Sequence, residues 1–193
     1  TQNQTVHKIL IAPDKFKGGL TSSQAAWAIR RGLEGHTGIK FRIVEIADGG
    51  DGSLEVVEKK VANGRRVQCE AADPVGVRRP VEYLMYGQGG KVSAFVEMAK
   101  VCGLAQLDAG LRNPLNTSTY GLGEVILDAA SRGAVSITLS IGGSATDDCG
   151  AGMLQALGFR LLDAAGAEIG RGGAALADVA EIRREGVMPE LEI

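Results

Sequence analysis

The sequence has few aromatic residues, only two histidines and no marked excess of either charge. Of its 193 residues, 4% are Phe, Trp or Tyr, and the formal net charge is −2. A surface that binds nucleic acid through its phosphates needs an excess of Lys and Arg, so this composition argues against that class of protein. With few aromatic side chains, the interior must be filled mainly by Val, Ile, Leu and Ala.

Long apolar runs are also missing. The longest uninterrupted ones fall well short of the roughly 18 to 20 residues that a membrane-spanning helix needs. The first residues, TQNQTVHK, lack the apolar core of a secretory signal. These features predict a soluble, cytoplasmic protein.

Three cysteines are present, at positions 69, 102 and 149, and no C-x-x-C occurs. An odd number without that spacing indicates neither a disulfide framework nor a zinc site, so we expect reduced thiols. Standard nucleotide motifs are missing as well. The sequence holds no G-x-x-x-x-G-K-[ST], and PDKFKGG, which follows the first apolar run, is not G-x-G-x-x-G. The absence of these motifs argues against a P-loop protein and against a nicotinamide-dependent oxidoreductase.

The first third of the chain alternates between strand and helix patterns. Strands are predicted at 7–13, 40–47 and 65–72, and helices at 22–35 and 51–64. Thr21 or Ser22 is a suitable N-cap for the first helix. Strands that alternate with helices over short loops favour an α/β fold with a parallel sheet.

The alternation stops near Asp73 and Pro74. Two strand patterns, at 78–87 and 90–99, are joined by QGG, which is typical of a hairpin turn. A helix is then predicted within 116–133, a strand at 134–141, a helix at 151–158 and a strand with a turn at 159–169. We therefore expect two lobes: a βαβαβ lobe with a Rossmann-like parallel sheet at 1–73, and a second, mixed α/β lobe at 74–193.

The first loop of interest, APDKFKGGLTSS, follows the first predicted strand. Ligands of open parallel sheets bind outside the carboxyl ends of the strands, so loops there have priority. Asp14 lies in this loop with Lys15 and Lys17, and Gly18 and Gly19 precede a helix. A lysine beside exposed N–H groups at a helix start suits a phosphate or a carboxylate. A solvated turn with two surface lysines explains the stretch equally simply.

A second loop, ADGGDGS at 47–53, places two carboxylates around two glycines. Asp48 and Asp51 could hold Mg²⁺ through oxygen ligands. Asp48 could instead accept a proton from a substrate hydroxyl. In the simpler alternative, Asp51 or Ser53 only caps the following helix.

Polar residues at 111–124 and one acidic residue before them are further candidates. Arg112 could bind a carboxylate or phosphate with two parallel hydrogen bonds. The hydroxyls at 117–119 could serve a ligand or cap a helix. Glu97 stands among apolar neighbours, so it is either buried with a partner or directed away from the edge of a strand.

The fourth stretch, SITLSIGGSATDDCGAGMLQALG at 136–158, combines a strand, a glycine-rich loop and a helix. That arrangement can hold phosphate with backbone amides. Two adjacent carboxylates repel naked phosphate, so a divalent cation between them, or a carboxylate facing the nucleophile, would explain them. A tight turn with an Asp N-cap is the alternative. The residues that would form this site are Gly142, Gly143, Ser144, Ala145, Thr146, Asp147 and Asp148.

Taken in order, these stretches resemble the bacterial-type glycerate kinase family, from about Lys8 to Arg184. Two loops depart slightly from the family pattern. The family usually has ADGGEGT where this sequence has ADGGDGS, and GGSATNDGGAG where it has GGSATDDCGAG. The matching segments are KILIAPDKFKGGLTSSQAAWAIRRGL, VEIADGGDGS, VEMAKVCGLAQL, RNPLNTSTYGLGEVILDAASRG and IGGSATDDCGAGMLQALGFRLLDAAGAEI.

The resemblance implies transfer of the γ-phosphoryl of ATP, with Mg²⁺, to a hydroxyl of D-glycerate. We expect 2-phosphoglycerate as product, with 3-phosphoglycerate as the other outcome. The implied partners are therefore small molecules, without nucleic acid or membrane. The implied roles are catalysis by Asp14, Asp48 and Asp148; metal binding by Asp51 and Asp147; and substrate or phosphate binding by Lys17, Gly49, Gly50, Arg112, Gly142, Gly143, Ser144, Ala145 and Thr146.

Family chains continue well beyond the position of Ile193, so the resemblance implies the N-terminal half to two-thirds of a family member. The alternative function is a catalytically inactive piece that only binds a phosphate ligand or oligomerises. It could form a homodimer or associate with the remaining part of the family fold.

Overall fold

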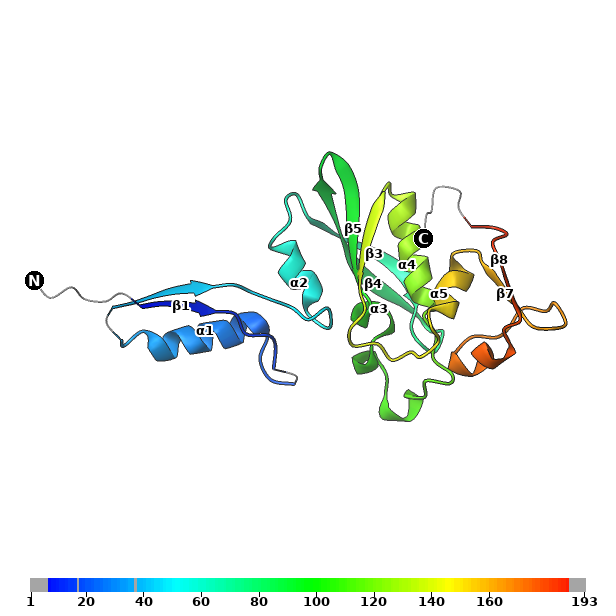
Figure 1. Cartoon of the computed structure of the whole chain (residues 1–193), viewed down its shortest axis with the longest axis horizontal. Helices are drawn as coiled ribbons and strands as arrows, with labels where there is room; N and C mark the ends of the chain where they lie inside the picture. The colour runs from blue at the N-terminus through cyan, green and yellow to red at the C-terminus, as the bar shows by residue number, and fades with distance from the viewer. Residues whose placement is uncertain (1–6, 17, 37, 188–193) are drawn as a thin grey trace, which may run out of the picture.

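The computed structural model describes residues 7–16, 18–36 and 38–187. Figure 1 shows an N-terminal unit that projects from a larger body. The unit consists of β1 (His7–Ile11), α1 (Ser22–Leu33) and β2 (Ile39–Ile43). Its two strands pair in parallel, as a crossover through a helix requires. This confirms the parallel α/β pattern expected for the start of the chain.

Helix α1 begins with a capping box. The Thr21 hydroxyl accepts a hydrogen bond from the Gln24 N–H at 3.2 Å, and the Gln24 side chain accepts one from the Thr21 N–H at 2.9 Å. Ala25 and Ala26 are buried, whereas Ile29, about one helical turn further on, is 43% exposed. The helix therefore uses its smallest apolar residues for packing in the N-terminal unit.

The body contains a four-stranded sheet in the order β3 (Arg65–Ala72), β4 (Arg78–Gln88), β5 (Lys91–Glu97) and β6 (Ser136–Ser140). The pairs β3–β4 and β4–β5 are antiparallel, and β6 is parallel to β5. The hairpin predicted from QGG is confirmed as the β4–β5 connection.

The prediction that β3 joins the first, parallel sheet is wrong, because β3 belongs to the four-stranded sheet. A turn at Asp73 reverses the chain: the Asp73 N–H donates to the Val77 carbonyl, and its carboxylate accepts from the N–H groups of Val75 and Val77. This turn sends β4 back along β3, so the two strands pair throughout their length. Strand β2 belongs to the two-stranded sheet and β3 to the four-stranded one, so the chain passes from one sheet to the other between them. A domain boundary at Asp73 stays a prediction.

Helices cover both faces of the body's sheet (Figure 1). On one face, α4 (Tyr120–Ser131) packs against alternate strand residues such as Tyr83 and Val96. On the other, Leu54 of α2 (Ser53–Glu58) packs against Leu84 and Phe95. Successive strand side chains point to opposite faces, so each run of apolar residues in β4 and β5 serves two cores.

The remaining elements are short. They are α3 (Ala99–Cys102), η1 (Leu104–Gln106), η2 (Ala109–Leu111), α5 (Ala151–Ala156), β7 (Arg160–Leu162), η3 (Gly173–Asp178) and β8 (Glu181–Arg183). Strands β7 and β8 form a separate antiparallel pair. Among the residues that the structure describes, no helix has both the length and the apolar character to cross a bilayer.

Candidate functional site

Two glycine-rich loops touch through their backbones. The Gly142 N–H donates to the Gly49 carbonyl oxygen at 2.9 Å. A Cβ atom placed on Gly142 would lie 2.8 Å from the Gly50 nitrogen, which leaves no room for a side chain. Glycine is needed here because the two backbones approach so closely. The loops that follow β2 and β6 are therefore joined at one point.

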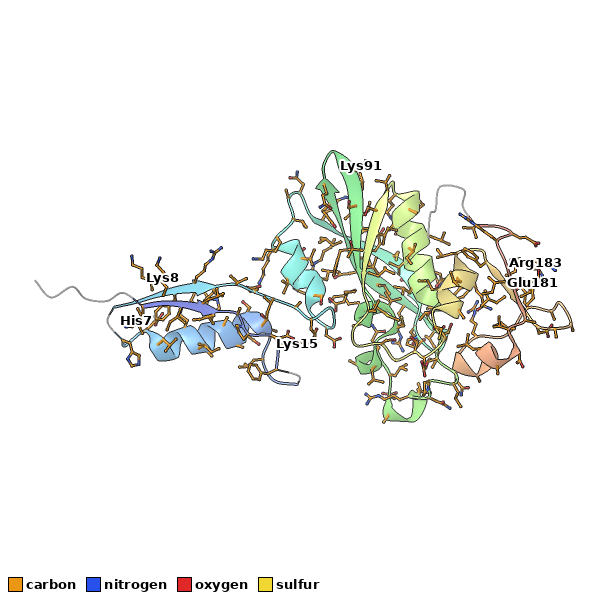
Figure 2. All side chains as sticks on the ribbon, viewed as in Figure 1. His7, Lys8, Lys15, Lys91, Glu181 and Arg183 are labelled. Carbon is orange, nitrogen blue, oxygen red and sulfur yellow. The ribbon has the colours of Figure 1, made fainter. Side chains whose placement is uncertain are left out.

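The loop that follows β1 reaches the same point through Lys15. Its Nζ donates to Asp48 Oδ1 at 3.2 Å, and the Gly50 N–H donates to the same oxygen at 2.8 Å. The Lys15 side chain is 17% exposed and that of Asp48 is 53% exposed. Figure 2 shows Lys15 at the end of the N-terminal unit nearest the body. All three loops thus converge where the unit and the body meet.

The electrostatics of this junction favour an ionised Asp48. The Gly50 N–H, and after it Lys15, lower the pKa of the Asp48 carboxyl below its ordinary value. Lys15 itself is absent from the sequence-based set of site residues, which contains Lys17 instead. Lys17 lies outside the described residues. Both lysines share one loop, so residue type alone could not select between them.

Asp14 and Asp51 line one cleft of about 830 Å³ between the N-terminal unit and α2. The Asp14 carboxylate accepts from the Lys15 N–H at 2.7 Å. Asp51 is exposed and has no hydrogen-bond partner within the described part of the chain. Its Oδ2 would lie 3.4 Å from a Cβ on Gly143, so its carboxylate adjoins the second glycine loop.

Of the four backbone N–H groups at 142–145, two already donate within the protein. The Gly142 N–H donates to Gly49, and the Ala145 N–H donates to the Cys102 carbonyl. The N–H groups of Gly143 and Ser144 have no acceptor among the described residues. These two amides remain for an anionic ligand. Beside them, the hydroxyls of Ser144 and Thr146 share a hydrogen bond of 2.6 Å.

Asp148 does not face the cleft. Its side chain is buried, and its oxygens accept hydrogen bonds from the Thr119 N–H at 2.8 Å and the Gly152 N–H at 3.1 Å, among others. These donors lie at the starts of α4 and α5, where a negative charge is stabilising. The geometry fits the capping alternative and gives no support to a catalytic role for Asp148.

Glu97 is buried with backbone partners. Its two oxygens accept from the N–H groups of Gly52 at 3.1 Å and Leu54 at 2.7 Å, so it caps α2 from the end of β5. Gly52, at the N-cap position, has no side chain to do so. Burial raises the pKa of the Glu97 carboxyl, and the two N–H groups offset only part of that rise.

Three other predicted site features are not among the residues that line this cleft. Arg112 is exposed and donates to the Leu107 carbonyl, while Thr117 donates to the Ala145 carbonyl. Asp147 is exposed, and its side chain has no hydrogen bond to another described residue. Within the described ranges, no three Asp, Glu, His or Cys side chains lie close enough together to hold a metal ion.

Comparison with known proteins identifies a family for this chain. The sequence pattern of the glycerate kinase family matches residues 9–193. This chain belongs to the glycerate kinase family. Similar family members include the glycerate kinase of Bacillus subtilis (strain 168), 44% identical over 93% of this chain. Another is the glycerate 2-kinase of Escherichia coli (strain K12), 41% identical over 96% of this chain.

A solved structure is also similar. The crystal structure of a proposed glycerate kinase 2 from Salmonella typhimurium LT2 covers 95% of this chain with 41% identity and a TM-score of 0.73. This chain covers 48% of that one, and 47% and 48% of the two curated relatives. It therefore spans about half the length of the glycerate kinases it matches.

Proposed function

We propose that this chain supplies part of the active site of an ATP-dependent glycerate kinase, which transfers the γ-phosphoryl group to a hydroxyl of D-glycerate. The names of its relatives support this activity. The observation that carries the proposal is a junction of three loops: Lys15 bonds to Asp48, and the next residue, Gly49, accepts from Gly142. The loop of Gly142 also holds the N–H groups of Gly143 and Ser144, which have no acceptor among the described residues.

Phosphoryl transfer requires alignment and charge neutralisation more than covalent chemistry by the protein. The oxygen of the glycerate hydroxyl forms a bond to the γ-phosphorus, the bond from that phosphorus to the bridging oxygen breaks, and ADP leaves. Lys15 and the two amides would neutralise charge on the phosphoryl oxygens. Asp48 would accept the hydrogen bond of the hydroxyl and, as the new bond forms, its proton, which then passes to water. Because its pKa is lowered, Asp48 suits orientation better than early removal of the proton.

The donor set fits Mg²⁺ that is held largely by phosphate. Magnesium sites of this kind use one or two carboxylates together with substrate phosphates and water. Asp51 offers an unpaired carboxylate beside Gly143, and Asp14 lines the same cleft. When bound, Mg²⁺ would neutralise phosphate charge that these acidic residues would otherwise repel.

The proposed product is 2-phosphoglycerate. The name of the Escherichia coli relative, glycerate 2-kinase, supports this choice over 3-phosphoglycerate.

ADP release with ATP and Mg²⁺, measured with and without D-glycerate on the protein that joins this chain to the rest of the family fold, tests the activity, and NMR of the product identifies the phosphorylated hydroxyl. We expect glycerate-dependent release that Asp48→Asn largely abolishes without a change in melting temperature. A folded protein of this kind that releases no ADP with glycerate would support the alternative, an inactive phosphate-binding or oligomerising piece.

A further inference from the structure

The two-stranded sheet of the N-terminal unit is incomplete. Parallel sheets occur almost only where both faces are covered, and a sheet of two strands has little stability of its own. Among the described residues, β1 and β2 pair only with each other. Figure 1 shows α1 lying along one side of the pair. In the described part of the chain, one face of this sheet and the outer edge of each strand are therefore open.

The open face of the sheet is the one that carries Leu10. Leu10 lies beside Arg42 in the register, and the flanking Ile9 and Ile11 point to the other face because side chains alternate along a strand. Leu10 is 63% exposed, whereas Ile11 is 3% exposed. Figure 2 shows Lys8, which shares a face with Leu10, on the side of the strands away from α1. A large apolar side chain thus lies on the face that α1 leaves uncovered.

The residue patterns of the two strands indicate where the sheet continues. Strand β1 reads HKILI, with three apolar residues in a row, which is typical of a strand buried on both faces. Strand β2 reads IKFRI, in which Lys40 and Arg42 alternate with apolar residues. That alternation is typical of a half-buried strand, and charged side chains protect an edge strand from further pairing. We therefore expect β2 to be an edge of the completed sheet and β1 an inner strand.

Two occupants could complete this sheet. This chain covers 47% of the Bacillus subtilis glycerate kinase and 48% of the Escherichia coli glycerate 2-kinase, so about half of each relative has no counterpart here. A second copy of this chain is the other candidate. If two copies paired edge to edge about a two-fold axis perpendicular to the sheet, both α1 helices would lie on the same side. Leu10 would then stay uncovered, so the remaining part of the family fold is the better match.

We propose that the free edge of β1 and the uncovered face around Leu10 form the docking surface for the remaining part of the family fold. That part adds a strand beside β1 and a layer over Leu10, while Lys40 and Arg42 of β2 stay in water. This surface serves the assembly of the fold, and its tests do not depend on the proposed activity.

Hydrogen exchange tests the added strand. The N–H groups of an inner strand bond to neighbours on both sides, so those of β1 that point away from β2 have no partner strand at present. In the protein that joins this chain to the rest of the family fold (the joined protein), these N–H groups should exchange at least about tenfold more slowly than in this chain alone. The outward N–H groups of β2 should exchange fast in both proteins. Equal exchange of β1 in the two proteins would overturn the proposal.

Leu10→Ala tests the covered face. Leu10 would be buried in the joined protein, so its truncation should lower the melting temperature by at least about 3 °C. In this chain alone Leu10 is 63% exposed, and the same change should shift the melting temperature by about 1 °C or less. Leu115→Ala is the matched control, at a leucine of the body that is 57% exposed, and should have little effect in either protein.

Sedimentation of this chain alone distinguishes the two occupants, and we expect a monomer. A dimer that Leu10→Ala dissociates, without slower exchange of β1 in the joined protein, would assign the surface to a second copy and reject the proposal. Equal melting temperatures of the joined protein with and without Leu10→Ala would show that no layer covers this face. Slower exchange of β1 together with a lowered melting temperature would support the docking surface, even in a joined protein that releases no ADP.

Discussion

The carboxylate of Glu97 accepts a hydrogen bond of 2.7 Å from the backbone N–H of Leu54. This bond joins the end of β5 to the first turn of α2. Glu97 also lies opposite Ser140 in the parallel register of β5 and β6, two residues before Gly142. One buried carboxylate therefore fixes the spacing between the two glycine loops.

Glu97→Ala should reduce the free energy of unfolding by about 1–3 kcal/mol, because the N–H groups of Gly52 and Leu54 lose their acceptor. Urea denaturation measures the change. Glu70→Ala, an exposed residue on β3, is the control and should change stability by less than about 0.5 kcal/mol. Equal effects of the two substitutions would contradict the capping role of Glu97.

The pH dependence of stability provides a second test of Glu97. Its pKa is raised from the ordinary value of 4.5, so the folded protein holds this proton more tightly than the unfolded chain does. The corresponding stability is complete below pH 4.5 and is lost as the pH rises through the raised pKa. The difference in unfolding free energy between wild type and Glu97→Gln should therefore decrease from pH 4 to pH 7. A difference that is constant across this range would exclude a raised pKa.

Gly142→Ala should separate the two glycine loops. The added Cβ would lie 2.8 Å from the Gly50 nitrogen and 2.9 Å from the Gly49 oxygen, so the backbone must move. Overpacking of this kind costs about 1–3 kcal/mol, and we expect glycerate-dependent ADP release to fall with it. Gly110→Ala is the matched control, since its Cβ would meet nothing within 4 Å. Wild-type stability in both variants would show that the loops do not touch in solution.

Asp148→Asn should destabilise the fold strongly. The new NH₂ group would face the N–H donors at the starts of α4 and α5, and a buried donor left without its acceptor costs about 1–3 kcal/mol. Asp147→Asn changes the exposed neighbouring carboxylate and should leave the melting temperature nearly unchanged. If the two variants melt alike, Asp148 is not the helix cap that the structure indicates.

Cys149→Gly should stabilise the protein. Cys149 has a φ of 49°, a left-handed conformation that costs a residue with a side chain about 1–2 kcal/mol. The greater flexibility of glycine in the unfolded chain offsets part of the gain, so we expect about 0.5–1 kcal/mol. Cys149→Ser keeps the Cβ atom and should give no increase. A gain from serine would point to the thiol rather than to the backbone.

The glycine loops could be located in the sequence by their composition, but their contact could not be predicted, because the strands that precede them, β2 and β6, belong to different sheets. The strand that pairs with β3 could not be predicted either, since an alternating pattern predicts a strand and not its neighbour in the sheet. The turn at Asp73 decides that partner through hydrogen bonds to Val75 and Val77. Local side-chain capping of this kind is visible in the sequence only as an Asp-Pro pair.

Residue roles were harder to predict than loop positions. Asp147 and Asp148 are adjacent and chemically identical, but one side chain is exposed and the other is buried. Only the path of the backbone distinguishes them. Glu97 lies 43 residues from Leu54, and its partner is a backbone N–H, which every residue except proline has. No residue type in the sequence could have indicated that contact.

The N-terminal unit and the body share no strand, and the segment between β2 and α2 links them. Within that segment, Asp48 bonds to Lys15 of the unit, and the next residue, Gly49, bonds to Gly142 of the body. A rotation of the N-terminal unit relative to the body would displace Asp48 and Gly49, which are adjacent in this segment. The distance from the Lys15 ammonium group to the N–H groups of Gly143 and Ser144 is therefore coupled to the angle between the unit and the body. Opening the cleft would thus take apart the proposed anion site in the same movement.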